Sequence, residues 1–359
     1  MHRVSRLTLG LAAALLAAPA SALAVPAVSP LASGLDNPRG LTVAPDGGIY
    51  VATAGRAGGR CLDPKKEQCY GFSGGVVRID PASGAKRTVA KGLLSLGGLD
   101  GSFTSGPGAV SVGADGSVHT VMTSATREVV TSLPRRVRAQ TGRLLRVAPG
   151  ARTSVARIDL LEWRANYDRV RGDRNSNPYG LLTLPDRTLV ADAGANAVFE
   201  VGTFGSRLLA VMPRNGRAQS VPTSLAAGAD GAIYVGELAE GAGKGKARVL
   251  RIDPATRAVT TFATGFSAIT GLASGPDGSL YVTELTEDFR RMAPGDVTRI
   301  APDGTRTSVG GGKLMFPAGA AVAADGTVYV STFSILPART PRKSPFKGAG
   351  GQVVRITGL

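Results

Sequence analysis

The stretch NPYGLLTLPDRTLVADAGAN, residues 177–196, decides the fold. Two short apolar segments, residues 180–184 and 188–191, flank a Pro-Asp turn, and this pattern predicts a β-hairpin followed by an Asp-Ala-Gly-Ala-Asn tail. The same frame recurs at five other places, and the six hairpin turns carry aspartates at Asp46, Asp115, Asp186, Asp230, Asp277 and Asp325. Six copies of one hairpin predict a repeat architecture.

Each repeat continues into a second hairpin, so the sequence predicts four antiparallel strands per repeat. The first strands are rich in small residues, as in GAVSV and GAAVA, and small side chains suit strands that converge on an axis. The second strands carry β-branched and aromatic residues, as in IYVGE and LYVTE. We therefore predict an all-β, six-bladed β-propeller, and a β-sandwich is the alternative.

The two ends of the chain supply one blade between them. Residues 28–35 resemble the last strand of the other repeats, whereas residues 351–356 resemble a third strand. The chain ends one strand short, so we predict that the two segments pair and close the ring. Closure of this kind removes exposed sheet edges.

The N-terminal residues have the pattern of an export signal. A basic start, an apolar run and the small-residue site Ala22-Leu23-Ala24 predict a signal peptide, residues 1–24, cut after Ala24. The alternative is an uncleaved anchor, but the apolar run is shorter than a spanning helix needs. We predict a secreted protein, extracellular or periplasmic, with residues 25–359 forming a single domain.

Cysteine content and charge restrict the function classes. Cys61 and Cys69, the only two cysteines, lie close together in an inserted loop, and export favours a disulfide between them. The net charge of +16 favours acidic polymers as partners, but basic residues are scattered with few aromatic residues between them. We therefore expect no specific nucleic-acid partner.

The motifs NPYGL, VADAGAN, SVPTSLAAGADGAIYVGE and DGSLYVTE resemble the ScyD/ScyE family of secreted bacterial proteins, from about residue 28 to the C-terminus. The resemblance implies a six-bladed propeller related in appearance to NHL-repeat and gluconolactonase-like proteins. It implies no established reaction. Gluconolactonase-like propellers hold a divalent metal with acidic and amide side chains at a place comparable to the candidate site described next.

Polar residues flank the inner strands where they open onto one face of the predicted ring. This face, which we call the looped face, also carries the insertions between second and third strands. The ligand-pocket candidates are Asn37, Arg39, Asn177, Tyr179, Asp192, Asn196, Glu237 and Glu284. Four of them offer the hard oxygen ligands that Ca²⁺ prefers: Asn177, Asp192, Glu237 and Glu284. The alternative is that these side chains cap strand ends and bond loop backbone.

Two functions follow from this face. The first is a non-catalytic, monomeric propeller that binds a small ligand, an acidic polymer of the wall or a protein partner. The second is a metal-assisted hydrolase or lactonase with Glu284 or Glu237 as the base. His119, the only histidine after the signal, replaces the tyrosine of equivalent strands, so we interpret it as structural rather than catalytic. The basic run at residues 338–347 is interpreted as a solvated loop.

Overall fold

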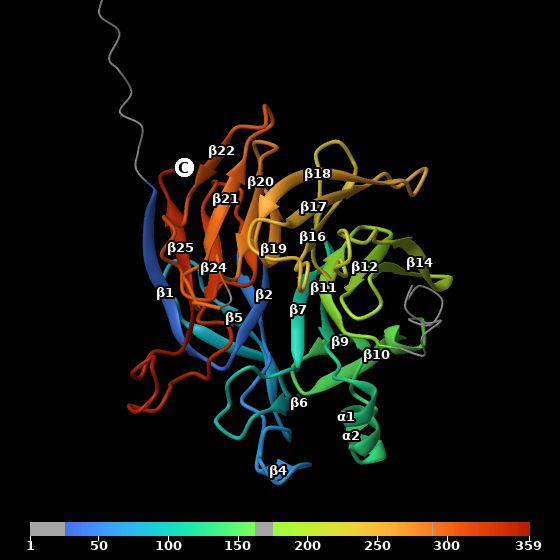
Figure 1. Ribbon diagram of the computed structural model, residues 1–359, viewed down its shortest axis with the longest axis vertical. Coiled ribbons are helices and arrows are strands. Elements are labelled where there is room, and N and C mark those ends of the chain that lie inside the picture. Colours follow the sequence, from blue (N-terminus) through green and yellow to red (C-terminus); the bar gives the residue numbers. More distant parts are fainter. Residues whose placement is uncertain (1–25, 162–174, 289) are drawn as a thin grey trace, which may run out of the picture.

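The computed structural model describes residues 26–161, 175–288 and 290–359, and it is a ring of six antiparallel sheets (Figure 1). The predicted all-β, six-bladed propeller is confirmed. The predicted signal peptide, residues 1–24, lies outside the described residues. Within the described ranges, no helix has the length and apolar composition needed to cross a bilayer.

Blades 1 to 3 each run from an inner strand to an outer one. Blade 1 contains β2 (Pro38–Val43), β3 (Ile49–Thr53), β5 (Cys69–Ile79) and β6 (Lys86–Gly97), with the short β4 (Arg60–Cys61) added to β5. Blade 2 contains β7 (Pro107–Val112), β8 (Val118–Met122), β9 (Arg143–Ala148) and β10 (Ala151–Arg157). Blade 3 contains β11 (Pro178–Thr183), β12 (Arg187–Asp192), β13 (Ala197–Gly202) and β14 (Gly205–Val211).

Blades 4 to 6 complete the ring. Blade 4 contains β15 (Pro222–Ala227), β16 (Ile233–Glu237), β17 (Ala247–Ile252) and β18 (Val259–Phe266). Blade 5 contains β19 (Ile269–Ser274), β20 (Leu280–Glu284), β21 (Asp296–Ile300) and β22 (Arg306–Ser308). Blade 6 contains β23 (Ala320–Val322), β24 (Val328–Thr332), β25 (Gly351–Thr357) and β1 (Ala27–Leu35).

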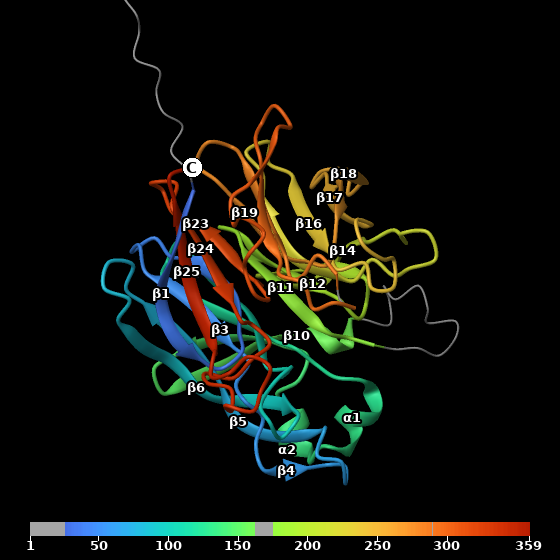
Figure 2. The same cartoon turned by 60° about the vertical axis from the view of Figure 1, so that its left-hand side comes forward.

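The predicted ring closure is confirmed. β1 pairs with β25 in antiparallel register, with Val28 opposite Ile356 and Leu35 opposite Gly351. The first and last strands of the chain therefore share blade 6, and both lie at the same side of the ring in Figures 1 and 2.

The hairpin turns opposite the looped face repeat one polar arrangement. In blade 1, Asp46 accepts a hydrogen bond from the Gly48 amide and pairs with Arg78, which stands across the strands from Tyr50. Blades 4 and 5 repeat the aspartate–arginine pair. In blade 2 the tyrosine position holds His119, opposite Arg146. Burial lowers the pKa of His119 and the charge of Arg146 lowers it further, which fits the structural role we predicted.

The hydrophobic core lies between neighbouring blades. For example, Val121 and Leu144 of blade 2 pack with Val190 and Phe199 of blade 3. At the axis the inner strands approach so closely that a Cβ built on Gly180 would lie 2.7 Å from the Thr223 carbonyl oxygen. The first strands are rich in small residues for this reason, and the cavity that they enclose at the axis is only about 40 Å³.

The insertions of blades 6, 1 and 2 gather at one end of the molecule, the lower end in Figures 1 and 2. The predicted disulfide between Cys61 and Cys69 is present in the blade 1 insertion. The blade 2 insertion forms α1 (Arg127–Ser132) and α2 (Arg135–Arg138), which the sequence analysis did not predict. The 3-10 helix η1 (Ile158–Leu160) follows β10.

Candidate functional site

Three of the eight predicted pocket residues meet at the mouth of the axis on the looped face. Arg39 of β2, Tyr179 of β11 and Asn177 just before β11 line one cavity of about 120 Å³. The cavity wall is completed by the segment that links blades 1 and 2, which contributes Phe103 and Thr104. We call this cavity the mouth cavity.

Asn37 does not line the mouth cavity but builds its wall. Its backbone is left-handed, with φ of 48°, and its side chain is fully buried. The Nδ2 group donates to the carbonyl oxygens of Gly55 and Gly101, at 2.8 and 2.7 Å. Because Gly101 belongs to the same segment as Phe103, Asn37 fixes the wall from behind.

Arg39 gives the mouth cavity a positive charge. Its Nη2 donates to the Thr104 carbonyl oxygen at 2.7 Å, and among the described residues Arg39 forms no ion pair. Tyr179 and Asn177 are part-buried beside it, and the Asn177 Oδ1 accepts a hydrogen bond from the Ser124 amide at 3.2 Å. The guanidinium therefore keeps donors for an anion that enters from the solvent.

Asp192 caps the end of β12. Its two carboxylate oxygens accept hydrogen bonds from the Ser176 hydroxyl and from the amides of Asn177, Gly194 and Ala195, at 2.6 to 3.1 Å. The side chain is fully buried, and burial raises the pKa of Asp192 to about 6 even though these hydrogen bonds act in the opposite direction. These are the contacts expected if Asp192 caps the end of its strand and bonds loop backbone instead of binding a ligand.

Asn196 and Glu237 tie blades 3 and 4 together. Asn196 accepts from the Val221 amide and donates to the Gln219 side chain, both at 2.9 Å. Glu237 is fully buried at the end of β16, where the Arg248 guanidinium donates to both carboxylate oxygens at 2.6 and 2.9 Å. The Ser220 hydroxyl and the Asn215 side-chain amide donate two more hydrogen bonds to this carboxylate, at 2.8 and 2.9 Å.

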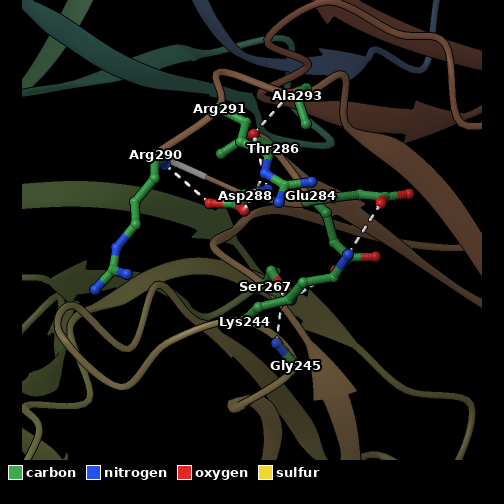
Figure 3. Close-up of polar contacts among 10 residues, drawn as sticks. Lys244, Gly245, Ser267, Glu284, Thr286, Asp288, Arg290, Arg291 and Ala293 are labelled. Atoms are coloured by element: carbon green, nitrogen blue, oxygen red, sulfur yellow. Dashed lines mark hydrogen bonds and ion pairs between the residues drawn. The ribbon is translucent and has the colours of Figure 1, made fainter.

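Glu284 occupies the same position in blade 5 but faces a different partner. Strand register places it opposite Asp296, where blade 4 has Arg248 opposite Glu237. Figure 3 shows its carboxylate directed toward Ser267, whose amide donates to Oε1 at 2.6 Å. Burial raises the pKa of Glu284 to about 7, and the negative charges of Asp296 and Glu287 contribute to the rise.

A larger cleft lies between the looped ends of blades 4 and 5, and it is lined by Ser267, the hydrogen-bond partner of Glu284. Its volume is about 650 Å³, and its lining residues include Leu238, Lys244, Ser267 and Asp288. Lys244 pairs with Glu287 across the cleft at 3.4 Å. The cleft rim therefore carries both signs of charge, unlike the mouth cavity.

The four predicted metal ligands are not assembled around one point. Asp192 and Glu237 have both carboxylate oxygens engaged by protein donors, and Asn177 uses its oxygen on a backbone amide. In the described part of the chain, no group of three or more acidic, histidine or cysteine side chains is arranged to hold a metal ion. The donor set therefore does not fit a shared Ca²⁺ in this arrangement, since a cation would have to displace the Arg248 guanidinium.

The sequence analysis missed Phe103, Thr104, Arg248 and Asp296. The last two lie within the first two residues of the third strands of their blades, so counting along the repeat from Glu237 and Glu284 could have found them. Phe103 lies in a connection specific to blade 1, and no repeat position pointed to it.

Comparison with solved structures supports the fold. Similar structures include a streptogramin B lyase, the PQQ-bound form of an aldose sugar dehydrogenase from Streptomyces coelicolor and an auxiliary nutrient binding protein from Bacteroides thetaiotaomicron VPI-5482. They are 13%, 14% and 11% identical to this chain, with TM-scores of 0.53, 0.55 and 0.54. The matches cover 92%, 93% and 92% of this chain and 97%, 98% and 76% of theirs.

These neighbours include enzymes and a binding protein, so the comparison leaves the function open. No protein-family model matches the sequence, and no curated protein matches it. Membership of the ScyD/ScyE family therefore stays a prediction.

Proposed function

We propose that the protein is a non-catalytic, secreted propeller that binds a small carboxylate with an apolar body in the mouth cavity. The observation that carries the proposal is the position of Arg39, which has no acidic partner among the described residues and shares a cavity with Tyr179 and Phe103. A guanidinium recognises a carboxylate through paired N–H donors, and aromatic side chains accept a flat apolar group.

The size of the cavity supports the same ligand class. About 120 Å³ accommodates a single aromatic ring with one carboxylate but not a polymer chain. The wall is also preformed, because Asn37 holds Gly101 from behind. A preformed site loses less ordering entropy when the ligand binds.

Secretion and a monomeric state belong to the same proposal. The disulfide between Cys61 and Cys69 supports an oxidising compartment, in line with the predicted signal peptide.

A hydrolase that uses Glu284 is the second candidate, and one observation favours it. Burial raises the pKa of Glu284 to about 7, which suits a general base at neutral pH, and its hydrogen-bond partner Ser267 lines the 650 Å³ cleft. No metal is needed for this version. Loss of any hydrolytic activity in Glu284→Gln, with ligand binding at the mouth cavity unchanged, would support it.

The test of the first proposal is calorimetric titration with benzoate, with benzamide as the neutral control. We expect benzoate to bind and benzamide to bind at least about tenfold more weakly, because a hydrogen bond to a charged group contributes about 1.5 to 3 kcal/mol. Arg39→Gln should weaken benzoate binding by a similar factor, whereas Arg87→Gln, an exposed arginine near the opposite face, should not. Equal binding by the parent and Arg39→Gln would refute the proposal.

A further inference from the structure

The looped face carries a basic rim around blades 6, 1 and 2. We define the basic rim by the segments 55–73, 98–105, 127–138 and 338–347, which contain twelve cationic and four acidic side chains, a net charge of +8. All twelve cations are exposed, and none forms an ion pair with a described residue. They are Arg56, Arg60, Lys65, Lys66, Arg127, Arg135, Arg136, Arg138, Arg339, Arg342, Lys343 and Lys347.

The four segments form one continuous surface. Leu133 and Val137 of the helical insertion pack in the same core cluster as Tyr70 and Leu96 of blade 1. The blade 6 segment is held against blade 1, because the Ala338 amide donates to the Asp36 carboxylate at 2.8 Å. Figures 1 and 2 show β4, α1, α2 and the blade 6 loop at the same end of the molecule.

Three large apolar side chains stand exposed within this rim: Phe72, at 44% exposed, and Leu99 and Phe103. Leu99 is 49% exposed and Phe103 is 62% exposed, and both belong to the segment that links blades 1 and 2. The Leu99 amide donates to the Lys66 carbonyl oxygen at 3.0 Å, and the Phe103 amide donates to the Ile335 carbonyl oxygen at 2.9 Å. A segment anchored at both apolar residues presents them to solvent in a fixed orientation.

Two of the four acidic groups of the rim form hydrogen bonds within their own turns. Asp63 accepts hydrogen bonds from the amides of Glu67 and Gln68, and Asp100 accepts from the Ser102 amide and hydroxyl. Because twelve cations face four carboxylates in these segments, the field that a large partner meets is positive.

From this surface we propose that the protein docks on anionic lipid membranes, with Leu99 and Phe103 entering the headgroup layer and the basic rim binding lipid phosphates. Exposed apolar side chains surrounded by arginine and lysine are the features that peripheral proteins use at such an interface. A linear polyanion would contact the cations but leave Leu99 and Phe103 in water. A polyanion partner therefore explains the exposed cations but not the exposed apolar side chains beside them.

This inference goes beyond the proposed function but shares one residue with it, since Phe103 also lines the mouth cavity. Ligand binding depends chiefly on Arg39 inside the cavity, whereas membrane docking also uses Leu99 and the cations of the basic rim. Leu99 does not line the mouth cavity, so its substitution tests docking alone.

The experiment is co-sedimentation of the whole mature protein with vesicles. We expect binding to vesicles of phosphatidylglycerol and phosphatidylcholine in equal parts, about tenfold or more stronger than to phosphatidylcholine alone, and weaker at high salt. Leu99→Asn should reduce binding several-fold and Leu99→Asn with Phe103→Asn about tenfold or more. The matched control is Phe204→Asn, since Phe204 is fully exposed at the β13–β14 turn, away from the looped face.

Charge variants complete the test. Arg135→Gln, Arg136→Gln and Arg138→Gln together should weaken vesicle binding about tenfold or more, whereas Arg87→Gln should not. Arg39→Gln should weaken benzoate binding at least about tenfold and keep vesicle binding, which separates the two proposals. Melting curves check that each variant folds. The inference would be overturned if the unsubstituted protein did not bind anionic vesicles. It would also be overturned if binding were unaffected by the Leu99 and Phe103 substitutions but were competed by soluble polyphosphate, since that result identifies a polyanion surface.

Discussion

The same substitution at equivalent positions of two neighbouring blades should have opposite effects on stability. Glu237 and Glu284 both end the second strand of a blade, but Glu237 faces Arg248 and Glu284 faces Asp296. We predict that Glu237→Gln destabilises the fold at pH 8 by about 3 kcal/mol, because it leaves a part-buried guanidinium without its charge partner. Glu284→Gln should stabilise the fold at the same pH.

The size of the Glu284 effect follows from its pKa. The folded-state pKa of about 7 lies above the ordinary value of 4.5, so the folded protein binds this proton more tightly than the unfolded chain does. The stability from this proton is fully present below pH 4.5 and is lost as the pH rises through 7. The loss between pH 5 and pH 8 is on the order of 2.5 kcal/mol.

Urea unfolding of the parent, Glu284→Gln and Glu237→Gln at pH 5 and pH 8 measures this difference. The parent should lose more free energy of unfolding over the interval than Glu284→Gln, by about 2.5 kcal/mol. Asp192 also has a raised pKa, but it is present in all three proteins and cancels in the comparison. An identical pH dependence in the parent and Glu284→Gln would show that Glu284 does not carry this linkage.

Three further predictions concern the scaffold and the metal. Deleting residues 26–35 should expose the edge of β25 and cause aggregation or loss of cooperative melting; a monomeric variant that melts like the parent would contradict the role of β1. Replacing Cys61 and Cys69 by serine should lower the free energy of unfolding by about 2 to 3 kcal/mol at most, because the bridged residues are 8 apart; urea unfolding of the double variant checks this, and a much larger loss would mean that the disulfide supports more than its loop. Adding Ca²⁺ after chelation should leave the melting temperature unchanged, since Asp192 and Glu237 are bonded to protein donors; a Ca²⁺-dependent rise would support the four-ligand metal site instead.

The fold could be predicted from the sequence because each blade repeats the same local signals. Asp230, followed by glycine and then by a strand with alternating apolar residues, specifies a turn and a register within a few residues. Four other copies share the Asp-Gly pair, and the blade 3 copy keeps the aspartate, Asp186, with arginine after it. The pairing of β1 with β25 was predictable for the same reason, since both segments resemble known strands of other blades.

The candidate site was only partly predictable because its contacts cross between repeats. Position along the blade placed Arg39 and Tyr179 at the same end of the ring, and they do share a cavity. The same rule also grouped Glu237 with Glu284, but the cross-strand partner sets the electrostatic environment of each carboxylate. This partner is Arg248 for Glu237 and Asp296 for Glu284. Side-chain pairing of this kind depends on contacts that the repeat pattern does not encode.

The closure of blade 6 by the first and last strands has a consequence for the order of folding. Ala27 pairs with Thr357, so β1 has no partner strand until the C-terminal end of the chain is available. Contacts so distant in sequence form slowly, because the intervening chain must first become compact. Blades 1 to 5 can collapse as local hairpins, whereas the last blade assembles only at the end. A chain cut short before β25 would therefore keep most of its sequence but leave β1 without a partner and the ring open.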